Sequence, residues 1–208
     1  MKSHFRQKAK INRADISSKV GQDCISQSHL NECLNKVLFN KNNITTVGLY
    51  YPMLDEISPL SLISYFKLKH FKITLPFVSF DTRSLLFKSW NIKENLIKGR
   101  LGNFETQSNN INFLPELLIV PMLMFDKNLN RLGYGGGYYD MTIKTLKSYF
   151  KSNKKDFTTI GVAYSRQETK NLPHEKHDEK LDFFLVKSLI EKKMLSSSML
   201  DDYIDSIS

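Results

Sequence analysis

The chain of 208 residues has few cysteines, and these lie in a segment with the residue spacing of a helix. Its two cysteines, Cys24 and Cys33, are nine positions apart, so they are expected on different helix faces and not in a disulfide. Neither belongs to a Cys-x-x-Cys pair, which argues against zinc ligation. We expect both to pack as ordinary helix residues and predict a reducing, cytoplasmic location.

Long apolar runs are absent as well. The longest uncharged one, residues 117–125, contains nine residues and includes a proline. A helix that spans a bilayer needs about 20 apolar residues. The N-terminus continues into charged residues, which is not typical of a secretory signal. We therefore expect no membrane-spanning segment.

Glycine is scarce, yet four of the nine glycines fall within Gly133–Gly137. Acidic residues are outnumbered, because 30 lysines and arginines face 21 aspartates and glutamates, a net charge of +9. The excess is concentrated in residues 1–50, where eight basic residues face three acidic ones. Such a charge indicates an anionic partner, which can be nucleic acid, a membrane surface or a phosphorylated small molecule.

Strand-like and helix-like segments alternate along the chain, which is typical of an α/β domain. Helical spacing extends over residues 5–39, with a break expected near residues 15–18, where aspartate and serine offer N-cap chemistry. Further helices are predicted from Ser58-Pro59 onward and at residues 138–149 and 187–195. Strands are predicted at residues 46–51, 72–76, 84–90, 117–121, 158–164 and 182–186.

This order predicts a single α/β domain over residues 1–195, with a mostly parallel sheet and helices on both faces. Residues 196–208 are expected to form a polar C-terminal tail. Ligands of parallel sheets gather at the carboxyl ends of the strands. Pro121 and the loop that follows it should therefore lie on the functional edge.

The glycines belong to the segment Arg131-Leu-Gly-Tyr-Gly-Gly-Gly-Tyr-Tyr-Asp140, between a predicted strand and a predicted helix. Glycines let backbone N–H groups converge on an anion, and a helix N-terminus adds unpaired donors. Arg131 can add a positively charged guanidinium group with two parallel N–H donors, and Asp140 can hold Mg²⁺ beside a phosphate. The segment lacks both the dinucleotide fingerprint and the P-loop ending. It predicts a phosphate loop of another design, with a ligand-free turn as the alternative.

This segment, preceded by Val120-Pro-Met-Leu-Met-Phe-Asp126, resembles the signature of the 5-formyltetrahydrofolate cyclo-ligase family, also called methenyltetrahydrofolate synthetases. The resemblance covers most of the chain. Its further matches, in order, are Lys2-Ser-His-Phe-Arg6 with the later Arg13, Tyr51-Pro-Met-Leu-Asp-Glu56, Leu75-Pro76, Ala163-Tyr-Ser-Arg-Gln167 and Leu172-Pro-His-Glu-Lys-His-Asp178.

The resemblance implies a cytoplasmic ligase of one-carbon metabolism. It would convert 5-formyltetrahydrofolate and ATP to 5,10-methenyltetrahydrofolate, ADP and phosphate. ATP would phosphorylate the formyl oxygen, and N10 of the folate would then attack the activated carbon. Such a transfer depends on positioning and charge neutralisation. We accordingly expect small-molecule substrates, Mg²⁺ as cofactor, a monomer and neither a nucleic-acid nor a membrane partner.

The same resemblance implies a role for each matching residue. Arg131 and Tyr139 would be catalytic, and Asp140 and Asp178 would hold Mg²⁺. ATP binding is implied for Lys2, Arg6, Arg131, Leu132, Gly133, Tyr134, Gly135, Gly136, Gly137, Tyr138 and Tyr139. Folate binding is implied for Tyr51, Glu56, Tyr134, Gly135, Gly136, Gly137 and Tyr138. For Tyr138 and Tyr139, packing under the loop is an alternative to stacking on the pterin.

Several positions depart from the family pattern. Met122 and Met124 stand where small residues are usual, Thr106 replaces a proline, and Met141 replaces an arginine. The methionines can narrow the space beside the nucleotide or alter packing under the loop. These departures motivate one alternative, a member that binds ATP and folate with weakened catalysis. A second alternative, a nucleic-acid-binding module, rests only on the basic residues 1–50.

Other polar residues have simple structural interpretations. Asp126 is expected to close a turn with Asn128 and Asn130, because these side chains favour local hydrogen bonds. Gln167 can orient a ligand or cap the end of a strand. His174 and His177 are three positions apart, but their charged neighbours favour an exposed loop over a metal site.

Overall fold

The computed structural model describes residues 2–21, 27–39, 41, 44–107, 109, 113–187 and 193–196. Cys24 and residues 197–208 of the predicted tail lie outside this part of the chain. Cys33 is buried in α2 (Gln27–Leu38). Among the described residues, no helix combines the length and the apolar character needed to cross a membrane.

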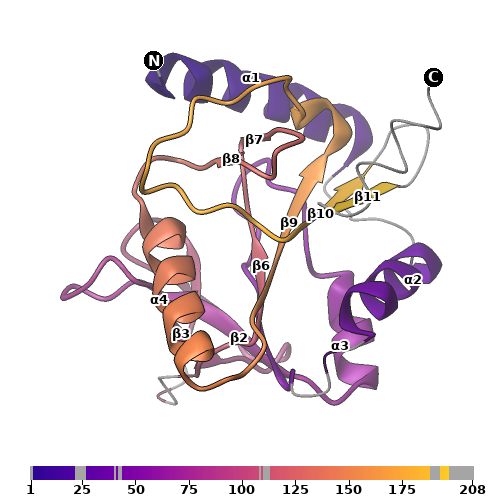
Figure 1. Ribbon diagram of the computed structural model, residues 1–208, viewed down its shortest axis with the longest axis vertical. Coiled ribbons are helices and arrows are strands. Elements are labelled where there is room, and N and C mark those ends of the chain that lie inside the picture. Colours follow the sequence, from indigo (N-terminus) through magenta and orange to yellow (C-terminus); the bar gives the residue numbers. More distant parts are fainter. Residues whose placement is uncertain are drawn as a thin grey trace.

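A seven-stranded sheet with the order β11-β10-β9-β6-β1-β2-β3 forms the centre of the molecule (Figure 1). The pairs from β10 to β2 are parallel, whereas β11 and β3 join the two edges in antiparallel orientation. This arrangement confirms the predicted mostly parallel sheet. The strands are β1 (Thr46–Gly48), β2 (Lys72–Phe77), β3 (Leu86–Ser89), β6 (Leu117–Val120), β9 (Thr158–Tyr164), β10 (Phe183–Lys187) and β11 (Lys193–Ser196).

Helices cover both faces of this sheet. Helix α4 (Tyr138–Ser152) lies on one face, and α2 and α3 (Leu62–Leu68) lie on the other (Figure 1). All four residues of β6 are buried, because alternate side chains face opposite layers. Leu118 packs with the α4 layer and Ile119 with the α2–α3 layer. The uninterrupted apolar run therefore forms a doubly covered central strand.

Two short hairpins lie outside the main sheet. One pairs β4 (Leu96–Lys98) with β5 (Phe104–Thr106), and the other pairs β7 (Met124–Phe125) with β8 (Arg131–Leu132). A 3-10 turn, Ser165–Gln167, follows β9. Helix α1 (Lys2–Val20) runs across the edge toward which β9 points, above the β7–β8 hairpin (Figure 1). The hairpin and α1 place polar loops at the carboxyl ends of the parallel strands.

The first predicted helix break is wrong. Helix α1 continues through residues 15–18, where the Ser18 hydroxyl donates to the Asp15 carbonyl oxygen (2.8 Å) within the helix. The helix is followed by Gly21, whose φ of +70° is the left-handed conformation typical of a helix C-terminus. The glycine, rather than the aspartate and serines, marks the boundary.

Two other boundaries also differ. The helix expected from Ser58 begins at Leu62, because the Ser58 hydroxyl first accepts a hydrogen bond from the Leu60 N–H (3.3 Å) in a turn. Of the helix predicted at residues 187–195, Lys187 ends β10 and residues 193–195 belong to β11, which pairs antiparallel with β10, while residues 188–192 lie outside the described part of the chain. Pairing with the exposed edge of β10 overrides the local helical pattern there. The strand ends at Ser196.

A buried carboxylate holds the β7–β8 turn. Asp126 Oδ1 accepts hydrogen bonds from the backbone N–H groups of Asn128 (2.9 Å) and Asn130 (3.1 Å). The Asn130 side-chain amide donates to both carboxylate oxygens, and Oδ2 also accepts the N–H of Leu172 (3.0 Å). The prediction that Asp126 closes this turn is confirmed, and the same residue ties the turn to the segment before Asp178.

Replacing Asp126 with asparagine should lower the free energy of unfolding by about 2–4 kcal/mol, because an amide nitrogen cannot accept hydrogen bonds and leaves buried donors unpaired. Urea unfolding followed by circular dichroism measures the change. Asn128→Ala is the matched control, since Asn128 contributes its backbone N–H and its side chain is exposed. Equal unfolding free energies for Asp126→Asn and the unmodified chain would contradict this assignment.

Candidate functional site

The residues with implied roles gather where the parallel strands end. Pro121 follows β6, Ser165 follows β9, and the glycines connect β8 to α4. Helix α1 lies above these loops (Figure 1). Its basic residues Lys2, Arg6 and Arg13 all contact the loops, so the charge of the N-terminal segment is directed toward this edge.

Lys2 contacts two acidic residues. Its Nζ lies 2.6 Å from Asp178 Oδ2 and 3.3 Å from Glu175 Oε2. Burial opposes ionisation of Asp178, but hydrogen bonds from Lys2 and from the backbone N–H of Glu175 prevail and hold the pKa of Asp178 below its ordinary value. Ligand atoms of Glu175, His177 and Asp178 lie within 4.8 Å of one another. The carboxylate of Asp178 is therefore ionised and neutralised by an ammonium group.

Arg131 and Asp140 form a second such pair. Arg131 Nη2 donates to Asp140 Oδ1 (2.8 Å), and the arginine side chain is almost fully buried. Asp140, in the first turn of α4, also accepts the backbone N–H of Glu179 (3.2 Å), the residue after Asp178. The structure thus places Asp140 against the segment that carries Asp178. Both residues offer carboxylate oxygens, which are the ligands that Mg²⁺ prefers.

The glycine-rich loop, residues 133–137, lies between β8 and α4 and against Arg6. Arg6 Nε donates to the Gly133 carbonyl oxygen (3.0 Å), and a Cβ on Gly135 would lie 2.9 Å from the centre of the guanidinium. Gly137, with a φ of +72°, is the N-cap residue of α4. Glycines, a helix N-terminus and a guanidinium group together suit an anionic ligand.

Leu132, Tyr138 and Tyr139 have packing roles. The Leu132 carbonyl oxygen accepts the N–H of Leu123 (2.7 Å), which anchors the hairpin. Both tyrosines pack against the α4 layer of the core, as one of the two alternatives proposed, and the Tyr139 ring centre lies 5.8 Å from the Arg131 guanidinium. Burial, and then the charge of Glu56, raises the pKa of Tyr139 above its ordinary value. Its phenol therefore stays protonated at neutral pH.

A buried arginine connects the remaining elements of the site. Arg13 donates through Nε and Nη2 to the two carboxylate oxygens of Asp55 (3.0 Å each) and through Nη1 to the Met122 carbonyl oxygen (3.2 Å). Nη2 also donates to the Tyr134 hydroxyl, and Nη1 lies 3.7 Å from Glu56 Oε1. Four segments of the chain thus meet at one guanidinium group.

Burial is the main cause of two pKa shifts around this arginine. It raises the pKa of Glu56, while the backbone N–H of Met53, the positive charge of Arg13 and the hydroxyl group of Tyr134 act in the opposite direction. Burial, followed by the charge of Glu56, raises the pKa of Tyr134 to about 12. The site therefore contains a desolvated carboxyl group beside a neutral phenol.

Tyr51 belongs to a separate aromatic group near the β4–β5 hairpin. Its ring meets Trp90 edge-on, with centroids 6.1 Å apart, and Phe104 in a similar way at 5.0 Å. Glu56 follows in the same segment and is buried. This places an aromatic wall next to the segment that carries the buried carboxyl group.

The departures from the family pattern have different surroundings. Met122 is buried and fills the space above Gly161, where a Cβ would lie 2.0 Å from the methionine Cε. Of the two alternatives for this residue, the structure favours core packing. Thr106 is buried and donates to Glu94 (3.0 Å), Met124 lies in β7, and Met141 is exposed on α4.

Gln167 and the two histidines have the expected structural positions. The Gln167 amide accepts the N–H of Tyr164 and donates to the carbonyl oxygens of Met122 (2.9 Å) and Leu123 (3.1 Å). It thus caps β9 and fixes the segment after Pro121. His174 and His177 are exposed.

Sequence reasoning assigned no role to Arg13, Asp55 or Lys10. Lys10 lies over the Tyr134 ring, 5.4 Å from its centre. The spacing of Lys2, Arg6, Lys10 and Arg13 places all four on one helix face, and this periodicity was the available signal. Asp55 carried no such pattern, because its pairing with Arg13 depends on tertiary contact.

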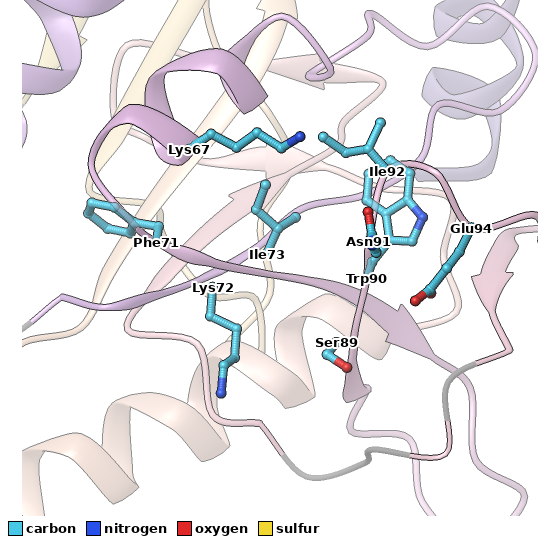
Figure 2. Close-up of a pocket in the computed structure, with 9 residues that line it drawn as sticks. All are labelled: Lys67, Phe71, Lys72, Ile73, Ser89, Trp90, Asn91, Ile92 and Glu94. Carbon is cyan, nitrogen blue, oxygen red and sulfur yellow. The ribbon is translucent and has the colours of Figure 1, made fainter.

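A surface hollow of ≈ 320 Å³ lies beside the aromatic group, because Trp90, the edge-on neighbour of Tyr51, lines it (Figure 2). Its wall includes Lys72 and Ile73 at the start of β2, whereas the glycine loop lies at the carboxyl ends of the strands. Lys67 extends above Ile73 toward Ile92, and Lys72 points away from them (Figure 2). No residue with an implied role lines this hollow, which is therefore not the predicted site.

Comparison with solved structures supports the fold. The 5,10-methenyltetrahydrofolate synthetase of Aquifex aeolicus superposes with a TM-score of 0.62 at 24% identity, over 94% of this chain and 92% of that one. The corresponding Mycoplasma pneumoniae protein gives 0.59 at 22% identity, over 89% and 96%. At these identities the likeness concerns the fold alone.

Sequence comparison agrees. A Haemophilus influenzae 5-formyltetrahydrofolate cyclo-ligase is 29% identical over 184 residues, 86% of this chain and 92% of the relative. A probable 5-formyltetrahydrofolate cyclo-ligase of Schizosaccharomyces pombe is 34% identical over 106 residues, 49% of this chain and 48% of the relative. The family model described as 5-formyltetrahydrofolate cyclo-ligase matches residues 1–187. Because that match includes α1, the glycine loop and six of the seven strands of the main sheet, the chain belongs to the 5-formyltetrahydrofolate cyclo-ligase family.

Proposed function

We propose that this chain catalyses the ATP-dependent closure of 5-formyltetrahydrofolate to 5,10-methenyltetrahydrofolate, with release of ADP and phosphate. The observation that carries the proposal is the pairing of two cations with two carboxylates, Lys2 with Asp178 and Arg131 with Asp140. A site for a metal-bound polyphosphate needs both kinds of charge within reach of each other.

The phosphates of ATP would lie against the glycine loop. Arg6 contacts that loop, and Arg131 lies just before it in the chain. Arg131 Nε is buried without a hydrogen-bond partner among the described residues. A buried N–H donor without a partner is costly, and a phosphate oxygen would satisfy it. Arg131 is therefore assigned to the transferred phosphoryl group, with Tyr139 supporting its guanidinium from below.

Asp140 and Asp178 would hold Mg²⁺. When bound, the ion would neutralise charge on the phosphate oxygens and help to align the γ-phosphate. Lys2 and Arg131, which pair with the two carboxylates in this structure, would then be able to contact phosphate. Binding of the nucleotide and of the metal would in this way be coupled through an exchange of ionic partners.

The reaction balances with the two substrates alone. The formyl oxygen attacks the γ-phosphorus, an O–P bond forms, and the bond to the bridging oxygen breaks to release ADP. The N10 lone pair then attacks the formyl carbon, N10 loses its proton, and phosphate leaves with the former formyl oxygen. The protein supplies orientation and charge neutralisation, which are the main contributions to such transfers.

The folate would bind between Glu56, Tyr134 and the aromatic wall of Tyr51. Glu56 Oε2 accepts the N–H of Met53 (3.0 Å), while Oε1 has no hydrogen-bond partner among the residues described. An ionised carboxylate in this state can accept a hydrogen bond from a pterin N–H group. Met122 is buried in the core, so its side chain is not assigned to folate binding.

The wild-type chain, with ATP, MgCl₂ and 5-formyltetrahydrofolate, is expected to generate the near-ultraviolet absorbance of the methenyl product, and Asp140→Asn should lower kcat by about 100-fold or more. Absorbance and ADP release are measured together at several pH values. Tight binding of both substrates without ADP release would instead identify the member with weakened catalysis. Failure to bind either substrate by a folded chain would remove the proposal.

Gly135→Ala should raise the KM for ATP about tenfold or more, because the added Cβ meets the Arg6 guanidinium. Gly102→Ala is a matched control: both glycines have positive φ, +102° and +79°, but nothing lies within 4 Å of a Cβ at Gly102. Both variants place an alanine at a positive φ, so the difference between their KM values for ATP measures the effect of the added Cβ in the glycine loop. Equal kinetics in both would argue against a phosphate role for it.

Lys2→Met should strengthen metal binding in the absence of ATP and weaken ATP binding, each severalfold, because Lys2 competes with cations for Asp178 and would later contact phosphate. Mn²⁺ binding by electron paramagnetic resonance and ATP binding by calorimetry measure the two effects. Lys19→Met, an exposed change on the same helix, is the control. Changes of the same sign in both affinities would contradict the exchange of partners.

A further inference from the structure

Arg13 is the largest fully buried side chain among the described residues, and its side chain is only 1% exposed. It comes from α1, which buries only two other residues, Ala9 and Ile16. A charged group in such a position is costly unless its surroundings satisfy it. The hydrogen bonds and ion pairs of Arg13 therefore offset the cost of burying its charge.

We propose that Arg13 is a positioning residue for the folate side of the site: through Asp55 and Tyr134 it fixes the buried Glu56 relative to the glycine-rich loop. The inference rests on the proposed function, because Glu56 and Tyr134 are placed there at the folate. Arg13 itself is not placed in contact with the reacting atoms.

The geometry needs an arginine. The guanidinium donates in a fork to both oxygens of Asp55, to the Met122 carbonyl oxygen and to the Tyr134 hydroxyl. A guanidinium presents five N–H donors in one plane, whereas a lysine ammonium is a single point of charge. A lysine at position 13 could keep the charge but could not hold these groups in one arrangement.

Glu56 shows that the cluster does more than hold the fold together. Its Oε1 is buried and lies 3.7 Å from Arg13 Nη1, beyond hydrogen-bond distance. A purely structural pair would be expected to use this oxygen in a hydrogen bond. Arg13 instead supplies a nearby positive charge and leaves Oε1 to accept a donor from the substrate.

The charged groups around Glu56 act on it with opposite signs. Burial raises the pKa of Glu56, Arg13 and Tyr134 lower it, and Asp55 raises it. From α4, Tyr139 also faces this carboxylate, and its phenol is kept neutral. Arg13 and Asp55 form one ion pair, yet loss of the positive partner and loss of the negative partner should move the Glu56 titration in opposite directions.

The first experiment compares Arg13→Lys and Asp55→Asn with the unmodified enzyme. Both variants disturb the fork, so each should raise the KM for 5-formyltetrahydrofolate about tenfold while kcat falls less than about threefold. Melting followed by circular dichroism verifies that they fold. Lys19→Met is the matched control on α1 and should match the unmodified chain.

The second experiment records kcat/KM for the folate against pH. Because ionised Glu56 accepts the substrate donor, the acid limb of this profile follows its titration in the free enzyme. Arg13→Met removes a positive charge and should move the limb to higher pH. Asp55→Asn removes a negative charge and should move it to lower pH, although both variants break the same ion pair.

These outcomes separate a positioning role from a general loss of stability or activity. Loss of kcat or stability in both variants, with unchanged KM and limbs that do not diverge, would overturn the proposal. If Arg13→Met does not fold, Arg13→Lys and Asp55→Asn still decide it through KM and the pH limb. Calorimetric titration of 5-formyltetrahydrofolate gives a readout that needs no turnover: weaker binding in Arg13→Lys supports the positioning role even if the proposed reaction fails.

Discussion

Ion pairing between α1 and the loops beneath it is the interaction on which the candidate site depends. The helix buries few apolar side chains, so apolar packing contributes little to its attachment. Lys2, Arg6 and Arg13 instead hold it to Asp178, to Gly133 and to Asp55. The basic charge that first suggested a nucleic-acid partner is thereby used within the molecule, around a site suited to anionic substrates.

Most of the fold could be predicted from hydrophobic pattern. The apolar run of β6 and the strand at residues 158–164 were placed correctly, because burial on both faces leaves a clear signal. Boundaries set by single residues or by pairing were missed. Gly21, rather than Asp15, follows α1, and β11 forms by pairing with β10 where the sequence favours a helix.

The site divides in the same way. The glycine loop, Arg131 and Asp140 lie in one continuous segment, so a local motif was enough to select them. Glu56, Tyr134 and Arg13 also match family motifs, but Arg13 contacts Asp55 and Tyr134, which are 42 and 121 positions away from it. No local pattern reveals the pairing of segments so distant. Met122 is another example, since Gly161 explains it only once β9 is in place.

The ion pair between Lys2 and Asp178 joins residues 176 positions apart. During synthesis, α1 emerges before its partners, most of which belong to the second half of this sequence. Few local contacts reward its early ordering, and long-range contacts form late in folding. The ion pair between Lys2 and Asp178 can therefore form only after synthesis has passed residue 178. A chain that stops before this residue lacks part of the candidate site.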